Sequence, residues 1–286
     1  MVLGQPGPVL TPLHAGVLGS PIDHSLSPTL HRAGYEATGL ADWRYTAHEV
    51  DEGGLAPFVT GLDVMWRGLS LTMPLKVAAF DVAESVTDTA RRAGAINTLV
   101  RTDSGWAADN TDVHGVTAAL AEAGVADLES ATVIGSGATA RSAVLGLVAL
   151  GARQVTVAAR TPERAAALAD VADIELQVVP LQEWASTGDR AVVSTVPAGA
   201  ANAAAGEHAG RDLTGTVLLD VVYADWPTPL GRAAATHGAH VVSGLEMLVH
   251  QAARQFELFT GEPAPVAQMQ AAGRAALGES GHTPDA

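Results

Sequence analysis

Residues 132–140 read Thr-Val-Ile-Gly-Ser-Gly-Ala-Thr-Ala, and this stretch decides the fold. Its pattern is a short apolar strand, the turn Gly135-Ser136-Gly137 and an Ala-rich helix that extends to Leu150. The first glycine permits a tight turn, the second lets a ligand approach the backbone, and the helix N-terminus offers free N–H groups. Strand, turn and helix in this order predict a pyrophosphate site, with Ala138 and Thr139 beside it. A lone G-x-G also fits an ordinary tight turn, so the prediction depends on this context.

The second strand of this unit, Gln154–Ala158, leads into Ala159-Arg160-Thr161 without an acidic residue. An Asp or Glu at this point would bind the ribose hydroxyls of NAD. Arg160 instead suits bidentate binding of a 2′-phosphate, and Thr161 could cap the next helix or donate to the same phosphate. An exposed arginine at a helix start is the plainer alternative. We expect NADP rather than NAD as the cofactor.

Alternating strands and helices extend on both sides of this unit. Between Asp112 and Gly244 the pattern predicts further strands, which are 175–179, 191–195 and 217–222. This spacing is typical of parallel β-α-β units in an open doubly wound sheet. Before Asp112 we predict helices at 28–38 and after Pro74, and strands at 15–19, 43–49, 64–71, 96–101 and 106–108. Two helices, 244–259 and 263–277, end the chain.

We therefore predict an α/β fold with two domains. An N-terminal α/β substrate domain spans residues 1–112 and is completed by 245–286. A Rossmann-like, doubly wound dinucleotide-binding domain spans 113–244. The C-terminal helices are expected to pack back on the first domain, which leaves a cleft between the two domains.

The composition narrows the class of partner. Hydrophobic residues make up 48% of the 286 residues, which argues against a disordered chain, and no apolar run is long enough to span a bilayer. The net charge of −15 repels the phosphates of nucleic acids and anionic lipids, so we expect a small-molecule substrate and neither of those partners. The absence of cysteine excludes disulfides and makes the cytoplasm the default location. The sequence leaves a homodimer open.

Lys76 is the single lysine among sixteen Lys and Arg residues. Arginine can replace lysine where only positive charge is needed, but not where an ammonium must give up a proton. Chance survival of one lysine fits the composition equally well. The bias nevertheless makes Lys76 a candidate for proton transfer.

Polar side chains gather where the predicted strands of the first domain end. The hydroxyls of Ser25 and Ser27 could hold a carboxylate at a helix N-terminus, although helix capping explains Ser27 equally well. The other members are Thr72, Lys76, Asn97 and the run Asp109-Asn110-Thr111-Asp112. An ammonium, carboxylates, amides and hydroxyls together suit a carboxylated, polyhydroxylated ring. No spacing of His, Asp and Glu resembles a metal site.

In order and spacing, these motifs resemble the shikimate dehydrogenase family, from about Ala15 to Gly261. Seven segments carry the resemblance: Pro21-Ile-Asp-His-Ser-Leu-Ser-Pro28, Thr72-Met-Pro-Leu-Lys76, Gly94-Ala-Ile-Asn-Thr98, Asp109-Asn-Thr-Asp112, the turn at Gly135, Asp220-Val-Val-Tyr223 with Thr228-Pro-Leu230, and Gly244–Ala252.

The resemblance implies NADPH-dependent reduction of 3-dehydroshikimate to shikimate, in the pathway to chorismate and aromatic amino acids. Lys76 and Asp112 would be the catalytic pair. This pair would also bind the substrate, together with Ser25, Ser27, Thr72, Asn97, Tyr223 and Gln251. The cofactor would contact Gly135, Ser136, Gly137, Ala138, Thr139, Arg160, Thr161, Thr195, Val221, Gly244 and Asp88. The resemblance implies no metal.

Three positions depart from the family's usual pattern. Ser70 stands where asparagine is common, the run Gly-Ser-Gly-Ala-Thr at 135–139 replaces Gly-Ala-Gly-Gly-Ala, and Ala159 stands where asparagine often precedes the arginine. The last two concern contacts to the cofactor, so they bear on its affinity rather than on the chemistry.

Hydride transfer to the ring ketone would place negative charge on its oxygen, which must be neutralised as it forms. Lys76 is the natural donor to this oxygen, with Asp112 holding the ammonium. One alternative is a quinate or quinate/shikimate dehydrogenase that uses NAD, and the missing acid after the second strand argues against it. Another is an inactive NADP-binding regulatory homologue, which the intact polar set argues against.

Overall fold

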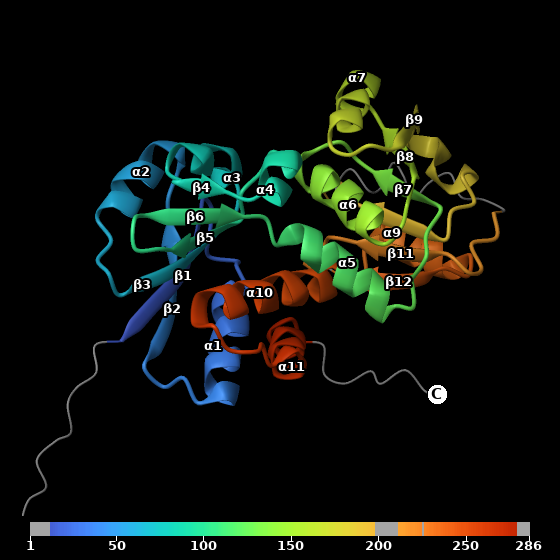
Figure 1. Ribbon diagram of the computed structural model, residues 1–286. Helices are drawn as coiled ribbons and strands as arrows, with labels where there is room; N and C mark the ends of the chain where they lie inside the picture. The colour runs from blue at the N-terminus through green and yellow to red at the C-terminus, as the bar shows by residue number, and fades with distance from the viewer. Residues whose placement is uncertain (1–11, 198–210, 225, 279–286) are drawn as a thin grey trace, which may run out of the picture.

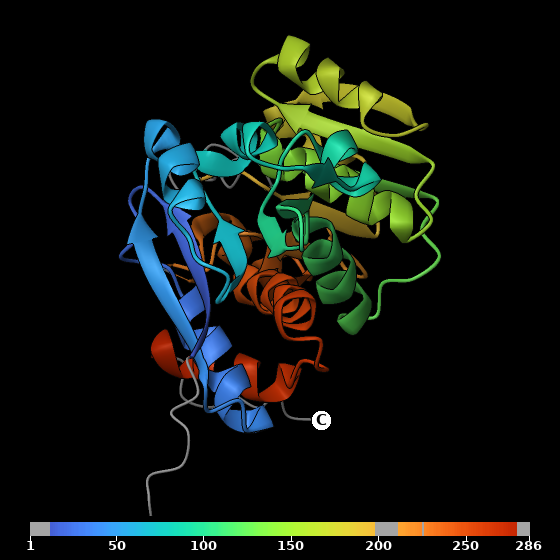
Figure 2. The same ribbon diagram turned by 60° about the vertical axis from the view of Figure 1, so that its left-hand side comes forward.

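Figure 1 shows a molecule of two lobes with helices at their junction, and the lobes stay distinct when the view is turned in Figure 2. The computed structural model describes residues 12–197, 211–224 and 226–278. Each lobe is built on one sheet, and the two sheets use different parts of the chain.

The sheet of the first lobe is mixed. Its strand order is β2 (Trp43–Glu49), β1 (Leu13–Gly19), β3 (Trp66–Leu71), β5 (Thr98–Arg101), β6 (Trp106–Asp109) and β4 (Ser85–Val86). β1 pairs in parallel with β2 and β3, whereas β5 runs antiparallel to β3 and β6. β1 is buried along most of its length, while the alternating exposure of β2 is typical of an edge strand with one covered face. The helices of this lobe are α1 (Ser27–Thr38), α2 (Glu52–Thr60), α3 (Leu75–Ala78) and α4 (Asp88–Ala93).

The sheet of the second lobe is parallel throughout its described strands. Its order is β12 (His240–Ser243), β11 (Val217–Asp220), β10 (Ala191–Ser194), β7 (Ser130–Ile134), β8 (Gln154–Ala159) and β9 (Glu175–Pro180). Helices α6 (Ala138–Ala149), α7 (Pro162–Ala166) and α9 (Pro229–Thr236) connect these strands. The order reverses between β7 and β10, and ligands of such sheets bind at the carboxyl ends of the strands beside this switch point.

Helices at the junction connect the lobes. α5 (Asp112–Glu122) packs against α6 of the second lobe and against α10 (Gly244–Thr260). α10 contacts β3 and β5 of the first sheet, and α11 (Val266–Ala276) lies against α1 and α10. The apolar stripe of α10 is buried, including Leu245, Val249 and Phe256. The C-terminal helices therefore pack back on the first lobe, as the sequence predicted.

The prediction of an α/β fold with two lobes and a doubly wound second sheet is confirmed. The sequence did not indicate α2, α4, α9 or β12, and it did not indicate that β5 and β6 run antiparallel in the first sheet. The strand expected at 64–71 begins at Trp66.

Candidate active site

Lys76 and Asp112 meet at the junction of the lobes. Lys76 lies on the short helix α3, just after β3, and Asp112 is the first residue of α5. Lys76 Nζ is 2.5 Å from Asp112 Oδ2, and the two side chains are 23% and 10% exposed. A charge-assisted hydrogen bond of this length fixes the ammonium in one place. The structure thus brings together the two residues that the sequence predicted to be a pair.

Asn97 holds the other oxygen of the same carboxylate. Asn97 Nδ2 donates to Asp112 Oδ1 at 2.8 Å and to Thr111 Oγ1 at 3.0 Å. The backbone N–H of Asp112 donates to Asn110 Oδ1 at 3.0 Å, and Asn110 Nδ2 donates to Ala95 O at 2.8 Å. Both amides are almost fully buried, so Asn97 holds the carboxylate of Asp112 firmly and Asn110 holds its backbone.

A cavity of about 220 Å³ opens in front of this pair. Its size suits a small metabolite, since it lies below the usual range for drug-sized ligands. All eight residues predicted to bind the substrate line it, namely Ser25, Ser27, Thr72, Lys76, Asn97, Asp112, Tyr223 and Gln251. Thr139, Val221 and Gly244, which were expected to contact the cofactor, line it as well. The cavity is therefore enclosed by both lobes.

Ser25 and Ser27 lie at the start of α1, and Ser27 does not cap this helix. The N-cap position is Leu26, which makes no side-chain cap hydrogen bond. The Ser25 hydroxyl accepts from the backbone N–H of Ser27 at 3.3 Å. Helix capping thus does not explain Ser27, whose side chain lines the cavity and also interacts with the Tyr45 hydroxyl. On the opposite wall, burial raises the pKa of Tyr223, so its phenol stays neutral.

The glycine turn after β7 fits a dinucleotide. Gly135 has a φ of 112°, and a Cβ there would lie 2.5 Å from Thr195 Oγ1. Thr195 follows β10 and its hydroxyl donates to Ile134 O at 2.9 Å, so the two strands at the switch point are tied together. A Cβ on Gly137 would meet nothing within 4 Å, which leaves open space at the N-terminus of α6. Tight turn, open space and free helix N-terminus are what a pyrophosphate requires.

Gly244 allows another close approach at the junction. A Cβ on Gly244 would lie 2.2 Å from the backbone oxygen of Val221. Only glycine therefore lets the start of α10 pass beside the end of β11, where both residues reach the cavity. This contact brings two residues that are far apart in sequence to the same part of the cavity wall.

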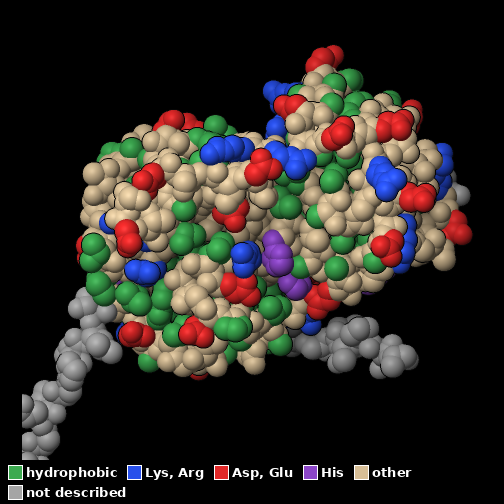
Figure 3. Space-filling model, in the orientation of Figure 1, with side chains coloured by type: hydrophobic (Ala, Val, Ile, Leu, Met, Phe, Trp, Pro, Cys, Tyr) green, Lys and Arg blue, Asp and Glu red, His purple; other side chains and the backbone are tan. Residues whose placement is uncertain are grey.

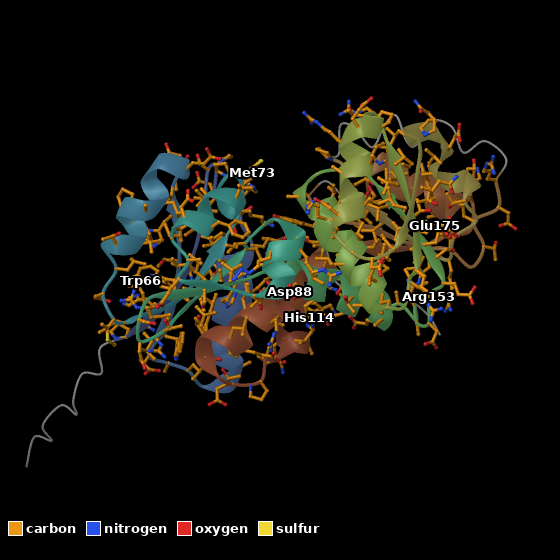
Figure 4. All side chains as sticks on the ribbon, turned by 45° about the horizontal axis from the view of Figure 1, so that its top comes forward. Trp66, Met73, Asp88, His114, Arg153 and Glu175 are labelled. Atoms are coloured by element: carbon orange, nitrogen blue, oxygen red, sulfur yellow. The ribbon has the colours of Figure 1, made fainter. Side chains whose placement is uncertain are left out.

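The remaining residues expected at the cofactor lie outside the cavity. Ser136 and Ala138 belong to the glycine turn, while Arg160 and Thr161 follow β8 and are exposed. Thr161 is the N-cap residue of α7 but makes no side-chain cap hydrogen bond, so one of its two expected roles is absent. Asp88 begins α4 at the junction of the lobes (Figure 4) and its side chain is 83% exposed, 3.9 Å from Arg92. The structure brings Asp88 near the junction but not into the cavity lining.

Sequence reasoning missed Gln255 and Tyr45 and treated Ser70 only as a departure from a pattern. Ser70 and Gln255 both line the cavity and are bonded to each other, with Ser70 Oγ 2.7 Å from Gln255 Oε1. One signal was available, because Gln255 follows Gln251 by four residues and so lies on the same face of α10. No sequence pattern indicated that the Tyr45 hydroxyl contacts Ser70.

The described residues, 12–197, 211–224 and 226–278, contain no cluster of potential metal ligands. No group of three or more His, Asp or Glu side chains there could hold a metal ion. Among the same residues, no helix combines the length and apolar character needed to cross a bilayer. Figure 3 shows basic side chains interspersed with acidic ones over both lobes on the face in view, without an extended basic patch.

The fold and the site define a two-domain, dinucleotide-dependent oxidoreductase. A parallel sheet of this strand order binds the cofactor at its switch point, and the paired ammonium and carboxylate face it across a cavity suited to a small polar molecule.

Comparison with known proteins gives the family. A family model described as the shikimate dehydrogenase substrate binding domain matches residues 17–99, and one described as the shikimate 5'-dehydrogenase C-terminal domain matches 244–272. Residues 130–223 match a model described as NADP oxidoreductase coenzyme F420-dependent. The shikimate dehydrogenase (NADP(+)) of Thermosynechococcus vestitus is 34% identical over 273 residues, covering 92% of this chain and 95% of that protein. The chain belongs to the shikimate dehydrogenase family.

Solved structures agree with this assignment. The crystal structure of Mycobacterium tuberculosis shikimate dehydrogenase is 45% identical, with a TM-score of 0.85, and the match covers 93% of this chain and all of that one. The Thermus thermophilus shikimate 5-dehydrogenase in complex with NADP(H) and shikimate is 31% identical, with a TM-score of 0.80 over 93% of this chain and 100% of that one.

Proposed function

We propose that this chain catalyses the reversible reduction of 3-dehydroshikimate to shikimate with NADPH, a step on the way to chorismate and the aromatic amino acids. One observation carries the proposal. The Lys76 ammonium, held 2.5 Å from Asp112, borders a cavity that is also lined by hydroxyls and amides. Family membership and the NADP-linked relatives give the same substrate and cofactor.

We assign the polar groups of the cavity to two parts of the substrate. Ser25 and Ser27 lie at the start of α1, where hydroxyls and backbone N–H groups favour an anion, and we assign the substrate carboxylate to this end. Thr72, Asn97 and Gln251 offer donors and acceptors for ring hydroxyls. Tyr223 stays neutral because burial raises its pKa, so it can donate a hydrogen bond without adding charge.

Lys76 and Asp112 are assigned the chemical step. When bound, NADPH supplies the hydride for the ring ketone. Lys76 donates a hydrogen bond and then a proton to the oxygen on which negative charge develops. Asp112 holds the ammonium in place through Oδ2 while Asn97 holds Oδ1, so the donor is oriented before the reaction begins. In the reverse direction Lys76 accepts the proton of the alcohol.

The cofactor is assigned to the carboxyl ends of β7, β8, β10 and β11. Gly135, Ser136, Gly137, Ala138 and Thr139 would lie under the pyrophosphate, and Thr195, Val221 and Gly244 would border the nicotinamide side. Arg160, with Thr161 beside it, would bind the 2′-phosphate. Asp88 is exposed at the junction and is assigned a peripheral contact.

The contacts among the elements support a division into two domains. We place the substrate domain at 1–112, completed by 245–286, and the NADP-binding domain at 113–244. We also propose that the chain acts in the cytoplasm on small molecules rather than on nucleic acids or membranes. A homodimer stays a prediction, which light scattering on the purified chain tests.

A grid of substrates and cofactors tests the function. Purified protein is incubated with shikimate or quinate and with NADP or NAD. Reduction of the cofactor is followed by the absorbance of the reduced nicotinamide. We expect the highest kcat/KM with shikimate and NADP. A preference for quinate and NAD would support the quinate dehydrogenase alternative, and no reduction in any combination would support an inactive homologue.

A further inference from the structure

A chain of buried hydrogen bonds runs behind the cavity from Tyr45 to Asp112. Tyr45 lies on β2 and reaches over the intervening strand β1 to Ser70 on β3, with its hydroxyl 2.6 Å from Ser70 Oγ. Ser70 Oγ lies 2.7 Å from Gln255 Oε1. Gln255 Nε2 then lies 3.0 Å from Asn97 O and 2.9 Å from Thr98 Oγ1. The five residues that form these bonds are at most 4% exposed, namely Tyr45, Ser70, Gln255, Asn97 and Thr98.

The direction of each bond in this chain is determined. The backbone oxygen of Asn97 can only accept, so the Gln255 atom beside it is the amide nitrogen. Its second hydrogen goes to Thr98 Oγ1, which leaves the Thr98 hydroxyl to donate to Asn97 Oδ1 at 2.7 Å. The backbone N–H of Thr111 also donates to Asn97 Oδ1, at 2.8 Å. The amide nitrogen of Asn97 must therefore face Asp112.

The same reasoning determines which hydrogen bonds the Ser70 hydroxyl donates and accepts. Gln255 uses both hydrogens of its nitrogen, so its oxygen accepts the Ser70 hydroxyl hydrogen. Tyr45 in turn donates to Ser70. A hydroxyl has one hydrogen and two lone pairs, so Ser70 keeps one lone pair free and offers the cavity an acceptor but no donor.

We infer that Tyr45 and Gln255 are positioning residues that set the donor and acceptor pattern of the substrate site. They make Ser70 an acceptor for a substrate hydroxyl, and they lock the Asn97 amide with its nitrogen on Asp112. A carboxylate, which can only accept, is disfavoured at Ser70, so a carboxylated polyol enters with its carboxylate at the Ser25 end. This inference rests on the proposed function.

The surroundings keep this pattern constant near neutral pH. Burial raises the pKa of Tyr45, so its hydroxyl remains a donor. The ring of His31 stacks on Tyr45 with 4.1 Å between centroids, and burial lowers the pKa of His31 to about 3. Tyr35 packs against the same imidazole, and burial raises its pKa as well. The aromatic and imidazole rings around the Tyr45 side chain are therefore neutral. The charged groups along the chain are Arg32, which donates to the backbone oxygen of Tyr45 at 2.9 and 3.1 Å, and the pair of Lys76 and Asp112 at the far end.

A double-mutant cycle tests the role of Tyr45. Tyr45→Phe keeps the ring on His31 and removes one hydrogen bond, so we expect kcat/KM for shikimate to fall about five- to tenfold, with KM for NADP within about twofold of the wild type. In a Ser70→Ala background the same change should have almost no effect, because Tyr45 acts through Ser70. An equal loss in both backgrounds, or no loss in the wild type, overturns the assignment.

Tyr35→Phe is the matched control. Tyr35 is 4% exposed in the same aromatic cluster, but its hydroxyl has no hydrogen-bond partner in the part of the chain that the structure describes. Its removal should leave kcat/KM for shikimate unchanged. A loss equal to that of Tyr45→Phe would mean that packing, rather than the hydroxyl, matters, and would overturn the inference.

Gln255→Glu tests the lock on Asn97. An ionised carboxylate has no hydrogen to offer the Asn97 oxygen, so we expect kcat to fall about tenfold or more. Thr98→Val removes the donor to Asn97 Oδ1 with little change of shape and gives the same test if Gln255→Glu does not fold. Unchanged kcat in a folded variant of either kind contradicts the lock. A wild-type chain without shikimate-dependent NADP reduction would instead refute the proposed function, which separates the two failures.

Discussion

Replacing Asp112 by asparagine should reduce turnover without unfolding the protein. Lys76 donates to Oδ2 of Asp112 and Asn97 donates to Oδ1, so both oxygens serve donors. The introduced amide has one oxygen and one NH2 group, and it can satisfy only one of these two donors. The variant therefore either releases Lys76 or places an NH2 group against the Asn97 nitrogen.

The size of the effect follows from the geometry. A hydrogen bond to a charged group contributes about 1.5–3 kcal/mol, which corresponds to roughly 10- to 150-fold. The Lys76 side chain is 23% exposed, so water replaces part of the lost partner. We expect the lower part of this range, a fall in kcat of about 10- to 50-fold.

Initial rates at saturating shikimate and NADP measure the effect, with thermal unfolding as the check on folding. Asp109→Asn is the matched control. Asp109 Oδ1 accepts from Thr87 Oγ1 at 2.6 Å and from Asn110 N at 2.8 Å, and an amide oxygen can still accept there. The control should keep kcat within about twofold of the wild type. A folded Asp112→Asn variant that also stays within this range would refute the reasoning.

Three further predictions concern the cofactor, the core and the junction of the lobes. Arg160→Ala should raise KM for NADP about tenfold or more and leave KM for shikimate near its wild-type value, because a bidentate contact to phosphate is lost; equal changes in both constants would count against the assignment. His31 is buried and its pKa is lowered to about 3, so its stabilising effect is complete above the unfolded value of 6.5 and is lost as the pH falls from 6.5 towards 3. In denaturant titrations, the free energy of unfolding of the wild type should therefore fall between pH 8 and pH 5 by about 2 kcal/mol more than that of His31→Phe. The same fall in both proteins would exclude this cause. Arg141 donates from Nε to Ala93 O at 2.9 Å and pairs with Asp170 at 3.0 Å, so Arg141→Ala should lower the free energy of unfolding by about 1–3 kcal/mol; an unaltered melting temperature would show that this bridge contributes nothing.

Strongly periodic elements could be predicted from the sequence. The helix expected at 244–259 is α10, Gly244–Thr260, because its apolar stripe recurs at helical spacing and glycine ends it. The helix α2 was missed, since Gly53, Gly54 and Pro57 all have low helix propensity. Tertiary structure overrides this preference. The Asp51 side chain accepts from Gly54 N–H at 2.8 Å, and Leu55 is buried.

Pairing within the first sheet was beyond sequence reasoning. Residues 98–101 and 106–109 form two short strands joined by a tight connection, and β5 then inserts antiparallel beside β3. Short strands carry too little pattern to specify partner or direction. The parallel order of the second sheet was easier to predict, because a helix follows almost every strand.

Site residues that lie in recognisable motifs could be predicted from the sequence. Residues that reach the site only through tertiary contacts could not. Lys76, Asn97 and Asp112 were chosen from chemistry and resemblance, and the structure brings both Lys76 and Asn97 within hydrogen-bond distance of Asp112. Tyr45 stands far from these motifs in sequence, and Gln255 lies three residues beyond the last of them. Their contact through Ser70 depends on the order of strands in the sheet and on how α10 lies against it.

The central claim is that the Lys76 side chain transfers the proton in the reduction of a carbocyclic ketone. Its most direct test is kcat of Lys76→Arg at saturating shikimate and NADP, because arginine keeps the positive charge beside Asp112 but does not give up a proton. The account predicts a loss of about a hundredfold or more in a variant that remains folded. Turnover close to that of the wild type would show that only the charge is needed and would contradict the account.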